Sequence, residues 1–499
     1  MKIVLDGAGT DLARVCRDIT ALFFPDAEIA EPGGSPEATD LHMVLSGERL
    51  RGMLNGKAAL YDAGGRADIQ ITAEKPQPVY DEKSHIKRLV TLSAYRAMAE
   101  YTGKKLPWGI LTGIRPTKVV HRLLDDGWPE ERIRRHLVED YELAADKAEL
   151  LLAVARRHRK YLPGADAVGR LISLYIGIPF CPTRCAYCSF PAFALDRWGY
   201  LTEKFLAALL KEIAVTGEKA AELGLKCQTI YIGGGTPTSL DVGQLERLLA
   251  AVMKYFVSTG AVEFTLEAGR PDTISPEKMA VAKQYGVNRV SVNPQSMNPG
   301  TLQVIGRQHA PEEIADAVEV VRAAGFDFIN MDVIAGLPGE TPKDFDHTLK
   351  TISGLNPENL TVHTLAVKRA SGINEHREQY RLPGADEVRV MLEMAVRAAA
   401  EMDMQPYYLY RQKHMVGPLE NVGYARAGYD CIYNVQMIEE RQTILALGAG
   451  AGSKFVCPAD WTLESLYNPK DPISYIENID ELIARKVGRL KEGNYDSQC

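Results

Sequence analysis

Residues 175–190 read YIGIPFCPTRCAYCSF and place Cys181, Cys185 and Cys188 in one loop directly after an apolar run. The apolar run predicts a buried strand, and the proline-containing segment after it predicts a turn-rich loop. The other cysteines of the chain stand singly, so we expect them to be buried or incidental thiols. The group of three therefore needs an explanation of its own.

The spacing C-x3-C-x2-C argues against a standard zinc site, which pairs two C-x2-C or Cys-His clips and closes all four coordination positions. No second clip follows in the chain. A four-iron cluster has four corners, and each corner takes a thiolate. Three cysteines on one loop would leave one iron open to another ligand. The sequence therefore predicts an iron–sulfur cluster with an open position.

Length and composition describe a large globular protein. With 499 residues the chain exceeds what one hydrophobic core usually supports, so we expect two or three domains. A composition of 46% hydrophobic and 25% charged residues, with a net charge of -7, gives no reason to expect nucleic acid as a partner. We find neither a signal peptide nor a stretch long enough to span a membrane. These features predict a cytoplasmic protein without structural disulfides.

The first part of the chain, residues 1–165, predicts an α+β domain. Strand-like pieces alternate with turns, and the pair Asn55–Gly56 between two alternating apolar runs predicts a hairpin turn. Apolar residues then recur at helical spacing over residues 81–103 and 129–161. A Leu-Pro-Gly break ends this pattern and puts the domain boundary near Asp166.

Beyond the boundary, residues 166–399 alternate short apolar strands with long helical patterns, which is typical of a parallel sheet. Six such units predict an α/β fold of the partial (β/α)6 barrel type rather than a closed eight-fold barrel. Residues 400–499 form a mixed C-terminal segment that we expect to cover the substrate. The six predicted strands are residues 171–178, 227–233, 262–268, 288–294, 326–336 and 360–366.

Chemistry in such folds collects at the carboxyl ends of the strands. A triple glycine there lets the backbone approach a ligand, although alone it would indicate only a tight turn. A single polar residue on a strand is more often a satisfied buried group, but several on one rim favour a ligand site. The strand ends lead to the cysteine loop, to Gly233–Gly235 with Thr236, and to Glu267, Gln295, Asp332 and Ala366, with Arg307 nearby.

These motifs resemble the radical S-adenosylmethionine (SAM) superfamily. The cysteine loop preceded by IPF, together with GGGTPT, PQSM and INMDVIAGLPGET, is similar to the oxygen-independent coproporphyrinogen III dehydrogenase group over about residues 171–370. The segments LTGIRPTKVVHRLL and LYRQKHMVGPLENVGYA resemble the HemZ branch of that group. The resemblance implies a radical SAM barrel that binds one 4Fe–4S cluster and one or two SAM molecules.

The resemblance also implies roles for single residues. Cys181, Cys185 and Cys188 would hold the cluster, and SAM would occupy the fourth iron through its amine and carboxylate. No catalytic residue is assigned beyond these ligands. The first SAM would contact Tyr175, Gly234 and Glu267, and the second would contact Tyr187, Gly235, Thr236, Gln295, Arg307, Asp332 and Ala366.

The implied activity is that of an oxidoreductase of haem biosynthesis. A radical derived from SAM would remove hydrogen from two propionate side chains of coproporphyrinogen III, and loss of carbon dioxide and one more electron from each would yield the vinyl groups of protoporphyrinogen IX. The partners would be this tetrapyrrole and an electron donor such as flavodoxin or ferredoxin. Substrate carboxylates need cationic partners, for which Arg411, Lys413 and Arg426 are candidates.

Two alternatives stay open. Phe190 stands where some members of the group have a further cysteine, and the resulting form also resembles the haem-chaperone branch of the superfamily. The chain could therefore be a haem-binding chaperone or another radical SAM enzyme that modifies a tetrapyrrole. The N-terminal domain argues against the chaperone, as does the sequence CIYNVQMIEERQ at residues 431–442, where that branch carries HNxxYW.

Overall fold

The computed structural model describes residues 1–7, 10–30, 41–50, 53–61, 66–73, 82–164, 168–413, 415–457 and 461–492. The chain separates into two compact units, Met1–Ala155 with Gly417–Leu419 and Arg156–Val416 with Glu420–Cys499. The boundary predicted near Asp166 lies outside the described residues. The division into residues 1–165, 166–399 and 400–499 stays a prediction.

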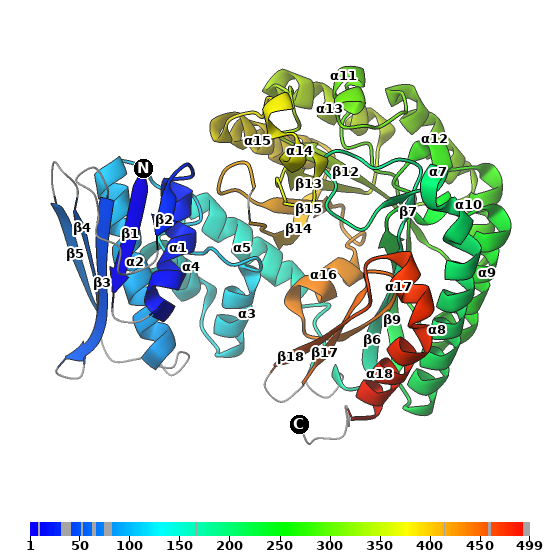
Figure 1. The fold of residues 1–499 in the computed structure, drawn as a ribbon, viewed down its shortest axis with the longest axis horizontal. Helices are drawn as coiled ribbons and strands as arrows, with labels where there is room; N and C mark the ends of the chain where they lie inside the picture. The colour runs from blue at the N-terminus through cyan, green and yellow to red at the C-terminus, as the bar shows by residue number, and fades with distance from the viewer. Residues whose placement is uncertain are drawn as a thin grey trace. The chain divides into compact units, whose positions relative to one another are not determined.

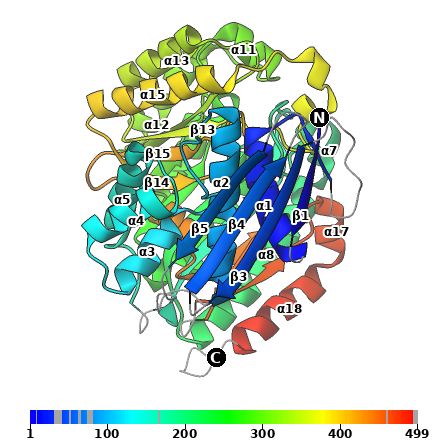
Figure 2. The same cartoon turned by 90° about the vertical axis from the view of Figure 1, so that its left-hand side faces the viewer.

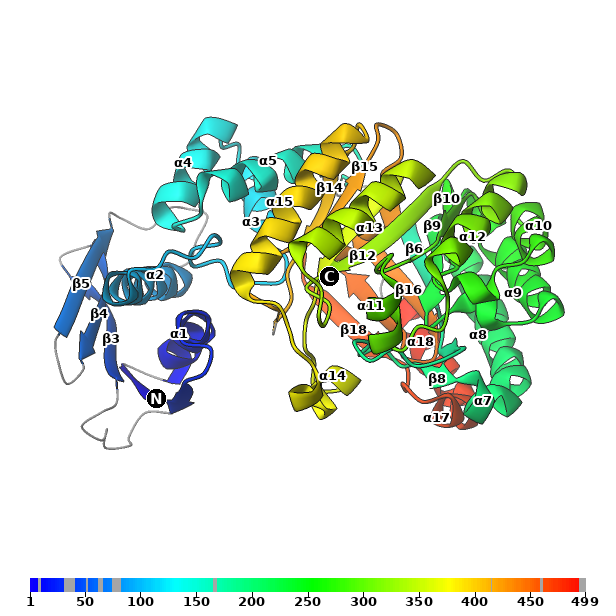
Figure 3. The same ribbon diagram turned by 90° about the horizontal axis from the view of Figure 1, so that it is seen from above.

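The first unit is a five-stranded sheet with α1 and α2 on one face, as Figures 2 and 3 show. The strand order is β2-β1-β3-β4-β5, with parallel pairing around β1 and antiparallel pairing around β4. This arrangement confirms the predicted α+β domain. The elements are β1 Lys2–Gly7, α1 Thr10–Phe23, β2 Glu28–Ala30, β3 Leu41–Leu50, β4 Met53–Tyr61, β5 Arg66–Ala73, α2 Glu82–Thr102, α3 Thr117–Asp125, α4 Glu130–Asp140 and α5 Ala145–His158.

The hairpin turn predicted at Asn55–Gly56 is wrong, because both residues lie inside β4. The strands β3 and β4 do form a hairpin, but it pairs Leu50 with Met53. A Cβ atom at Gly56 would lie 2.4 Å from the carbonyl carbon of Leu89 on α2. Glycine is therefore required here because the helix packs directly against the strand, and not because the chain turns.

We expect Gly56→Ala to lower the free energy of unfolding by about 1–3 kcal/mol, since the added methyl forces the backbone of α2 to move. Gly113→Ala is the control, because a Cβ atom there would meet no atom within 4 Å. That variant should shift stability by less than about 0.5 kcal/mol. Urea unfolding followed by fluorescence of the buried Trp108 would compare them, and equal stabilities would contradict the packing argument.

The second unit is built on an eleven-stranded sheet in the order β14-β15-β13-β12-β11-β10-β9-β6-β16-β17-β18. All six predicted strands are present and pair in parallel in chain order. Figure 1 shows α8, α9, α10 and α12 along the outer side of the curved sheet. The predicted partial (β/α)6 barrel is confirmed. Its strands are β6 Leu171–Ile178, β9 Lys226–Gly234, β10 Glu263–Glu267, β11 Arg289–Ser291, β12 Ile329–Ala335 and β13 Asn359–Thr364.

The barrel helices begin where local signals in the sequence place them. Ser275 accepts a hydrogen bond from the backbone of Lys278 at the start of α10, and Thr341 does the same for Asp344 at α13. Both helices have proline at their first position. The remaining elements of this region are β7 Phe180–Cys181, β8 Phe193–Ala194, α7 Leu195–Trp198, α8 Thr202–Glu222, α9 Val242–Tyr255, α10 Pro276–Gln284, α11 Pro299–Val304, α12 Pro311–Ala323, α13 Pro342–Leu355, α14 Gly372–Glu375 and α15 Ala385–Glu401.

The C-terminal residues extend both edges of the same sheet. The strand β16 pairs in parallel with β6, an addition to the barrel that the sequence analysis missed. Two helices, α17 and α18, follow the last strand. These elements are β14 Gln405–Tyr410, β15 Asn421–Ala425, α16 Ile432–Glu439, β16 Thr443–Gly448, β17 Gly452–Val456, β18 Leu463–Tyr467, α17 Pro472–Glu477 and α18 Ile479–Glu492. Among the described helices, none has the length and apolar character needed to cross a membrane.

The helix α16 begins against the amino ends of the barrel strands. The carboxylate of Glu263, the first residue of β10, accepts hydrogen bonds from the backbone N–H groups of Ile432 at 2.7 Å and Tyr433 at 2.9 Å. Arg289, the first residue of β11, donates to the carbonyl of Tyr429 at 3.0 Å. The buried carboxylate thus satisfies backbone N–H groups at the start of α16 and fixes this helix against the amino ends of β10 and β11.

Candidate functional site

The three predicted cluster ligands lie in a loop that is anchored on both sides. The backbone N–H of Ala186 donates to Ile305 at 2.9 Å, and its carbonyl accepts from Ile373 at 2.9 Å. The thiol of Cys185 is buried, whereas Cys181 and Cys188 are half-buried. These anchors hold the loop across the barrel rim, between the end of β6 and the segment after β11.

The thiols fit a cluster better than a single zinc ion. A tetrahedral zinc site needs four ligands, and this loop supplies three with no second clip in the chain. A four-iron cluster can take these three thiolates at three of its corners. Burial raises the pKa of Cys181 to about 12, opposed by the Thr236 hydroxyl 3.4 Å away. Ligation to iron would supply the positive charge that a buried thiolate needs.

The glycines after β9 run directly against the thiol loop. The backbone N–H groups of Gly235 and Thr236 donate to the carbonyls of Ile178 and Phe180, each at 2.7 Å. A Cβ atom at Gly235 would lie 2.6 Å from the Phe180 carbonyl oxygen and 3.0 Å from the Cys181 sulfur. No larger residue fits this position, so the glycine is needed for the close approach that the sequence predicted.

Two carboxylates face the barrel interior with opposite pKa shifts. Burial raises the pKa of Glu267 to about 7, although the Tyr231 hydroxyl donates to it at 2.5 Å and opposes the shift. Burial would also raise the pKa of Asp332, but hydrogen bonds outweigh it and hold the pKa below its usual value. The donors are His363 at 3.5 Å and Asn330 at 2.8 Å. The site thus holds one firmly charged carboxylate beside one that titrates near neutral pH.

Gln295 is held in a strained backbone conformation, with φ of 67°. Its N–H donates to the carbonyl of Asp332 at 2.9 Å, and its carbonyl accepts from Ile334 at 3.0 Å. The side chain is buried, and its Oε1 atom has no hydrogen-bond partner among the described residues. A strained residue with an unsatisfied buried acceptor is the kind of group that a ligand donor would complete.

Arg307 connects the segment after α11 to the thiol loop. Its guanidinium donates to the Tyr187 hydroxyl at 3.1 Å and to the carbonyl of Gly269 at 3.1 Å. Tyr187 lies between the second and third cysteines, so this bond fixes the position of the loop. The Nε atom of Arg307 is buried without a partner in the described structure and remains available to a ligand.

Tyr175 lies deeper in the barrel. Its ring stacks with those of Tyr231 and Tyr433 at centroid distances of 6.4 Å and 6.2 Å.

Ala366 follows β13 and pairs with Met415 in an isolated bridge. Direct contacts or short-range charge interactions thus connect all predicted site residues except Ala366, which lies on the same rim.

The structure also identifies site residues that the sequence analysis missed. The hydroxyl of Tyr410 lies 3.0 Å from Nδ1 of His363, and Gln412 donates to that hydroxyl at 3.1 Å. With Asp332 they form a polar row across the ends of β12, β13 and β14. The sequence offers one weak signal for this row, because His363 interrupts an otherwise apolar strand. Many buried histidines occur in such strands without a functional role, so the signal is not specific.

The fold separates the cations that were predicted to bind carboxylate groups of the substrate. Arg426 donates to the carbonyl of Met402 at 3.0 Å and follows β15 at the level of Asn359, the first residue of β13. It therefore lies at the amino end of the barrel, away from the thiols. Arg411 follows β14 at the carboxyl end, where burial lowers its pKa to about 10 against the opposing charge of Glu420. Lys413 follows in the same segment.

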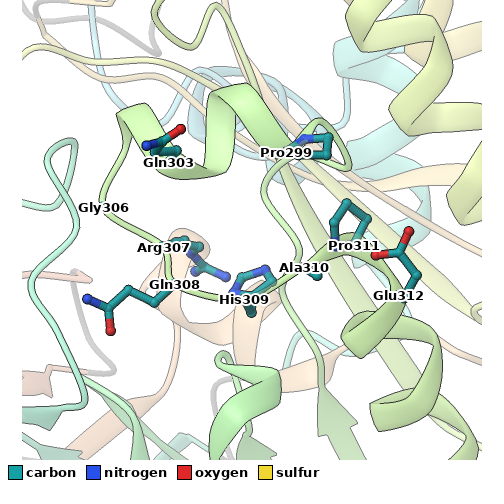
Figure 4. Close-up of a pocket in the computed structure, with 9 residues that line it drawn as sticks. All are labelled: Pro299, Gln303, Gly306, Arg307, Gln308, His309, Ala310, Pro311 and Glu312. Atoms are coloured by element: carbon teal, nitrogen blue, oxygen red, sulfur yellow. The ribbon is translucent and has the colours of Figure 1, made fainter.

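A pocket of about 450 Å³ lies beside Arg307, and Figure 4 shows His309 within it. His309 is only 4% exposed, and neither ring nitrogen has a hydrogen-bond partner among the described residues. Burial lowers the pKa of His309 to about 4, and the charges of Arg307 and Arg270 add to this shift. The ring is therefore neutral at physiological pH. The pocket is lined by Pro299, Gln303, Gly306, Arg307, Gln308, His309, Ala310, Pro311 and Glu312.

Comparison with known proteins agrees with this geometry. Residues 175–352 match the family described as the radical SAM superfamily. The chain is 38% identical over 512 residues to the oxygen-independent coproporphyrinogen-III oxidase-like protein HemZ of Bacillus subtilis, covering 99% of this chain and 98% of the relative. It is 32% identical over 282 residues to the haem chaperone HemW of the same organism, covering 56% of this chain and 70% of the relative.

Among solved structures, the chain is similar to coproporphyrinogen III oxidase (HemN) from Escherichia coli, described as a radical SAM enzyme. The TM-score is 0.51 at 24% identity, with 64% of this chain and 71% of that chain covered. This likeness supports the fold alone. The match to HemZ extends over nearly the whole of both chains, including the N-terminal unit. The chain belongs to the radical SAM superfamily, whose members use a 4Fe–4S cluster and SAM, and within it to the HemZ-like branch of the oxygen-independent coproporphyrinogen-III oxidase family.

Proposed function

We propose that this protein removes the carboxyl groups of two propionate side chains of coproporphyrinogen III oxidatively, forming protoporphyrinogen IX in haem biosynthesis. The observation that carries the proposal is the anchored three-thiol loop on a barrel rim that also carries Glu267 and Asp332. The likeness to the HemZ protein across both chains supports the choice of substrate. An electron donor such as flavodoxin or ferredoxin would supply the electron that cleaves SAM, and a separate electron acceptor would take the electron released with each carbon dioxide.

The residues of the chain prepare the site for this chemistry. Cys181, Cys185 and Cys188 would hold the cluster, and Glu267 would face the ammonium group of SAM. The cluster and SAM, when bound, supply one-electron transfer and hydrogen-atom abstraction. The Tyr231 hydroxyl orients Glu267, and the start of α16 is bonded to Glu263 at the amino end of β10. Enclosure matters because a primary carbon radical abstracts hydrogen from any accessible weaker C–H or S–H bond, so side reactions must be kept out of the site.

The C-terminal segment contributes to the substrate side of the site in this proposal. The end of β14 brings Tyr410 to 3.0 Å from His363, which in turn contacts Asp332. This contact supports the prediction that residues 400–499 cover the substrate. The same row offers hydrogen-bonding groups at the carboxyl ends of the strands, where they could hold polar groups of a tetrapyrrole.

A second candidate function is haem delivery without SAM cleavage. It is favoured by Phe190, which follows the third cysteine in the form shared with the haem-chaperone branch, and by the likeness to HemW. That likeness covers only 56% of this chain. Tight haem binding together with no SAM turnover would support this candidate.

An anaerobic assay tests the proposal. The reconstituted protein would be reduced in the presence of SAM, with or without coproporphyrinogen III, and products would be followed by mass spectrometry. We expect 5′-deoxyadenosine to rise with substrate and the tetrapyrrole to lose two carboxyl groups. SAM cleavage with intact coproporphyrinogen III would reject the substrate and leave another radical SAM reaction on a tetrapyrrole. Haem binding without cleavage would favour the chaperone.

The binding of SAM should depend on pH through Glu267. Because burial raises the pKa of Glu267 to about 7, its carboxylate is protonated below that pH and cannot pair with an ammonium group. The affinity for SAM should therefore fall as pH drops below 7, approaching about tenfold per unit, and level off above pH 8. Glu267→Gln should bind weakly at every pH, with this dependence removed.

Isothermal titration calorimetry with the full-length protein between pH 6 and 8.5 would measure this dependence. The control is Glu246→Gln, which changes a surface glutamate of α9 that contacts Tyr285. It should retain the pH profile of the unmodified protein. A steep profile in Glu267→Gln would show that another group controls binding.

A further inference from the structure

Three cations gather around the thiol loop. Lys368 and Arg369 follow β13, and Arg184 lies within the loop itself. The guanidinium of Arg184 donates to the carbonyl of Ala370 at 2.6 Å. The hydroxyl of Ser371 donates to the carbonyl of Lys368 at 2.7 Å, which closes a tight turn. These bonds hold Arg184 and the backbone of the turn that carries Lys368 and Arg369 on the same rim as the cysteines.

The three cations have no acidic partner. Across the part of the chain that the structure describes, no carboxylate lies within ion-pair distance of Lys368, Arg369 or Arg184, although acidic residues outnumber basic ones by 65 to 58 in the sequence. The side chain of Lys368 is half-buried, and Arg184 and Arg369 are exposed. The charge of the Cys188 thiolate acts on both Lys368 and Arg184. Iron would take up that charge when the cluster is bound, so the half-buried ammonium would then need another anion, which points to an anionic ligand.

An exposed aromatic ring completes this surface. Phe190, two residues after the third cysteine, is 63% exposed. The Lys368 ammonium lies 5.9 Å from the centroid of its ring. An open aromatic face beside a cation that has no carboxylate partner among the described residues matches a ligand that combines apolar rings with carboxylate groups.

We propose that Lys368, with Arg184 and Arg369 beside it, binds carboxylate groups of the tetrapyrrole substrate while Phe190 packs against one of its pyrrole rings. This inference rests on the proposed function and names the residues that recognise the substrate. In this inference Lys368 takes the carboxylate-binding role that was predicted for Arg426, which the fold places at the other end of the barrel. The half-buried position of Lys368 beside the thiol loop favours a small ligand over the surface of a partner protein.

The test uses coproporphyrin III as an air-stable tetracarboxylate and its tetramethyl ester as the uncharged counterpart. Binding to the full-length protein would be followed by porphyrin fluorescence. Lys368→Met should weaken binding of the acid at least about tenfold, the cost of a lost charge-assisted hydrogen bond. It should leave binding of the ester unchanged, and Lys368→Arg should retain most of the affinity. The control Lys350→Met removes a lysine of α13 that is 75% exposed and paired with Asp346, and should bind like the unmodified protein.

The outcomes separate this inference from the proposed function. If the unmodified protein binds neither porphyrin, both proposals are overturned. If it binds coproporphyrin III and Lys368→Met binds it equally well, only the present inference fails. Titration of SAM and reduction of the cluster by flavodoxin should be the same in both proteins. A loss in either of these, with porphyrin binding intact, would assign Lys368 to the cofactor or to an acidic redox partner and overturn the inference.

Discussion

Cys185→Ser is expected to yield a folded protein that holds no iron–sulfur cluster. The loop offers three thiolates to a cluster of four corners, so the loss of one leaves only two protein ligands. Serine is a poor ligand for iron in this setting, and the buried position of residue 185 leaves no room for a neighbouring cysteine to substitute. Iron per chain should fall from about four atoms to near zero, together with the visible absorption of the cluster.

The control for this variant is Cys227→Ser, which alters a cysteine that is equally inaccessible but lies near the start of β9. Its thiol donates to the backbone carbonyl of Thr229, and a serine hydroxyl can make the same hydrogen bond. This variant should keep its full iron content after anaerobic reconstitution. Equal iron loss in both variants, or full iron in Cys185→Ser, would place the cluster elsewhere.

Lys486→Met is expected to reduce the free energy of unfolding by about 3–5 kcal/mol, because it leaves the carboxylate of Glu212 buried without its counterion. Both side chains are fully buried, and the Lys486 ammonium also donates to the carbonyl of Ala446 at 2.7 Å. Glu212 further accepts hydrogen bonds from the Tyr475 hydroxyl at 2.7 Å and from the backbone of Gly448 at 2.8 Å. These bonds fasten α17, α18 and β16 to α8.

The matched control is Arg489→Met on the same helix. Arg489 pairs with Glu464 at the surface, where the two side chains are 24% and 62% exposed, so its loss should cost less than about 1 kcal/mol. Urea unfolding followed by circular dichroism would compare the variants. The double variant Glu212→Gln with Lys486→Met should recover part of the loss, because it removes the buried charge. Similar losses in Lys486→Met and Arg489→Met would refute a special role for the buried pair.

Most of the barrel could be predicted because its signals are local. Each of the six strands is a short apolar run followed by an amphipathic helix, and every one of them was found close to its predicted range. The strand β16 was missed for the opposite reason. Its sequence runs into alternating glycines and alanines that are typical of a loop, and only pairing with the distant β6 makes it a strand.

The same distinction explains the error at Asn55–Gly56. This dipeptide is a strong turn signal by itself, but packing of α2 against β4 demands a glycine in the middle of a strand. The contact joins residues that are more than thirty positions apart, and no local pattern reports it. The position of Arg426 was likewise decided by the antiparallel pairing of β15 with β13.

By itself the sequence determined the cysteine loop, the alternation of strands and helices, and hence the rim to which the strands deliver Glu267, Gln295 and Asp332. These features follow from hydrophobic periodicity and from residue spacing. Both are contained within short stretches of chain, whose local conformational preferences do not depend on distant residues. Only the tertiary structure decided that Tyr231 holds Glu267, that His363 joins Asp332 to Tyr410, and that Lys368 faces Phe190. Such contacts depend on the register and twist of strands far apart in sequence, which hydrophobic burial over the whole unit sets.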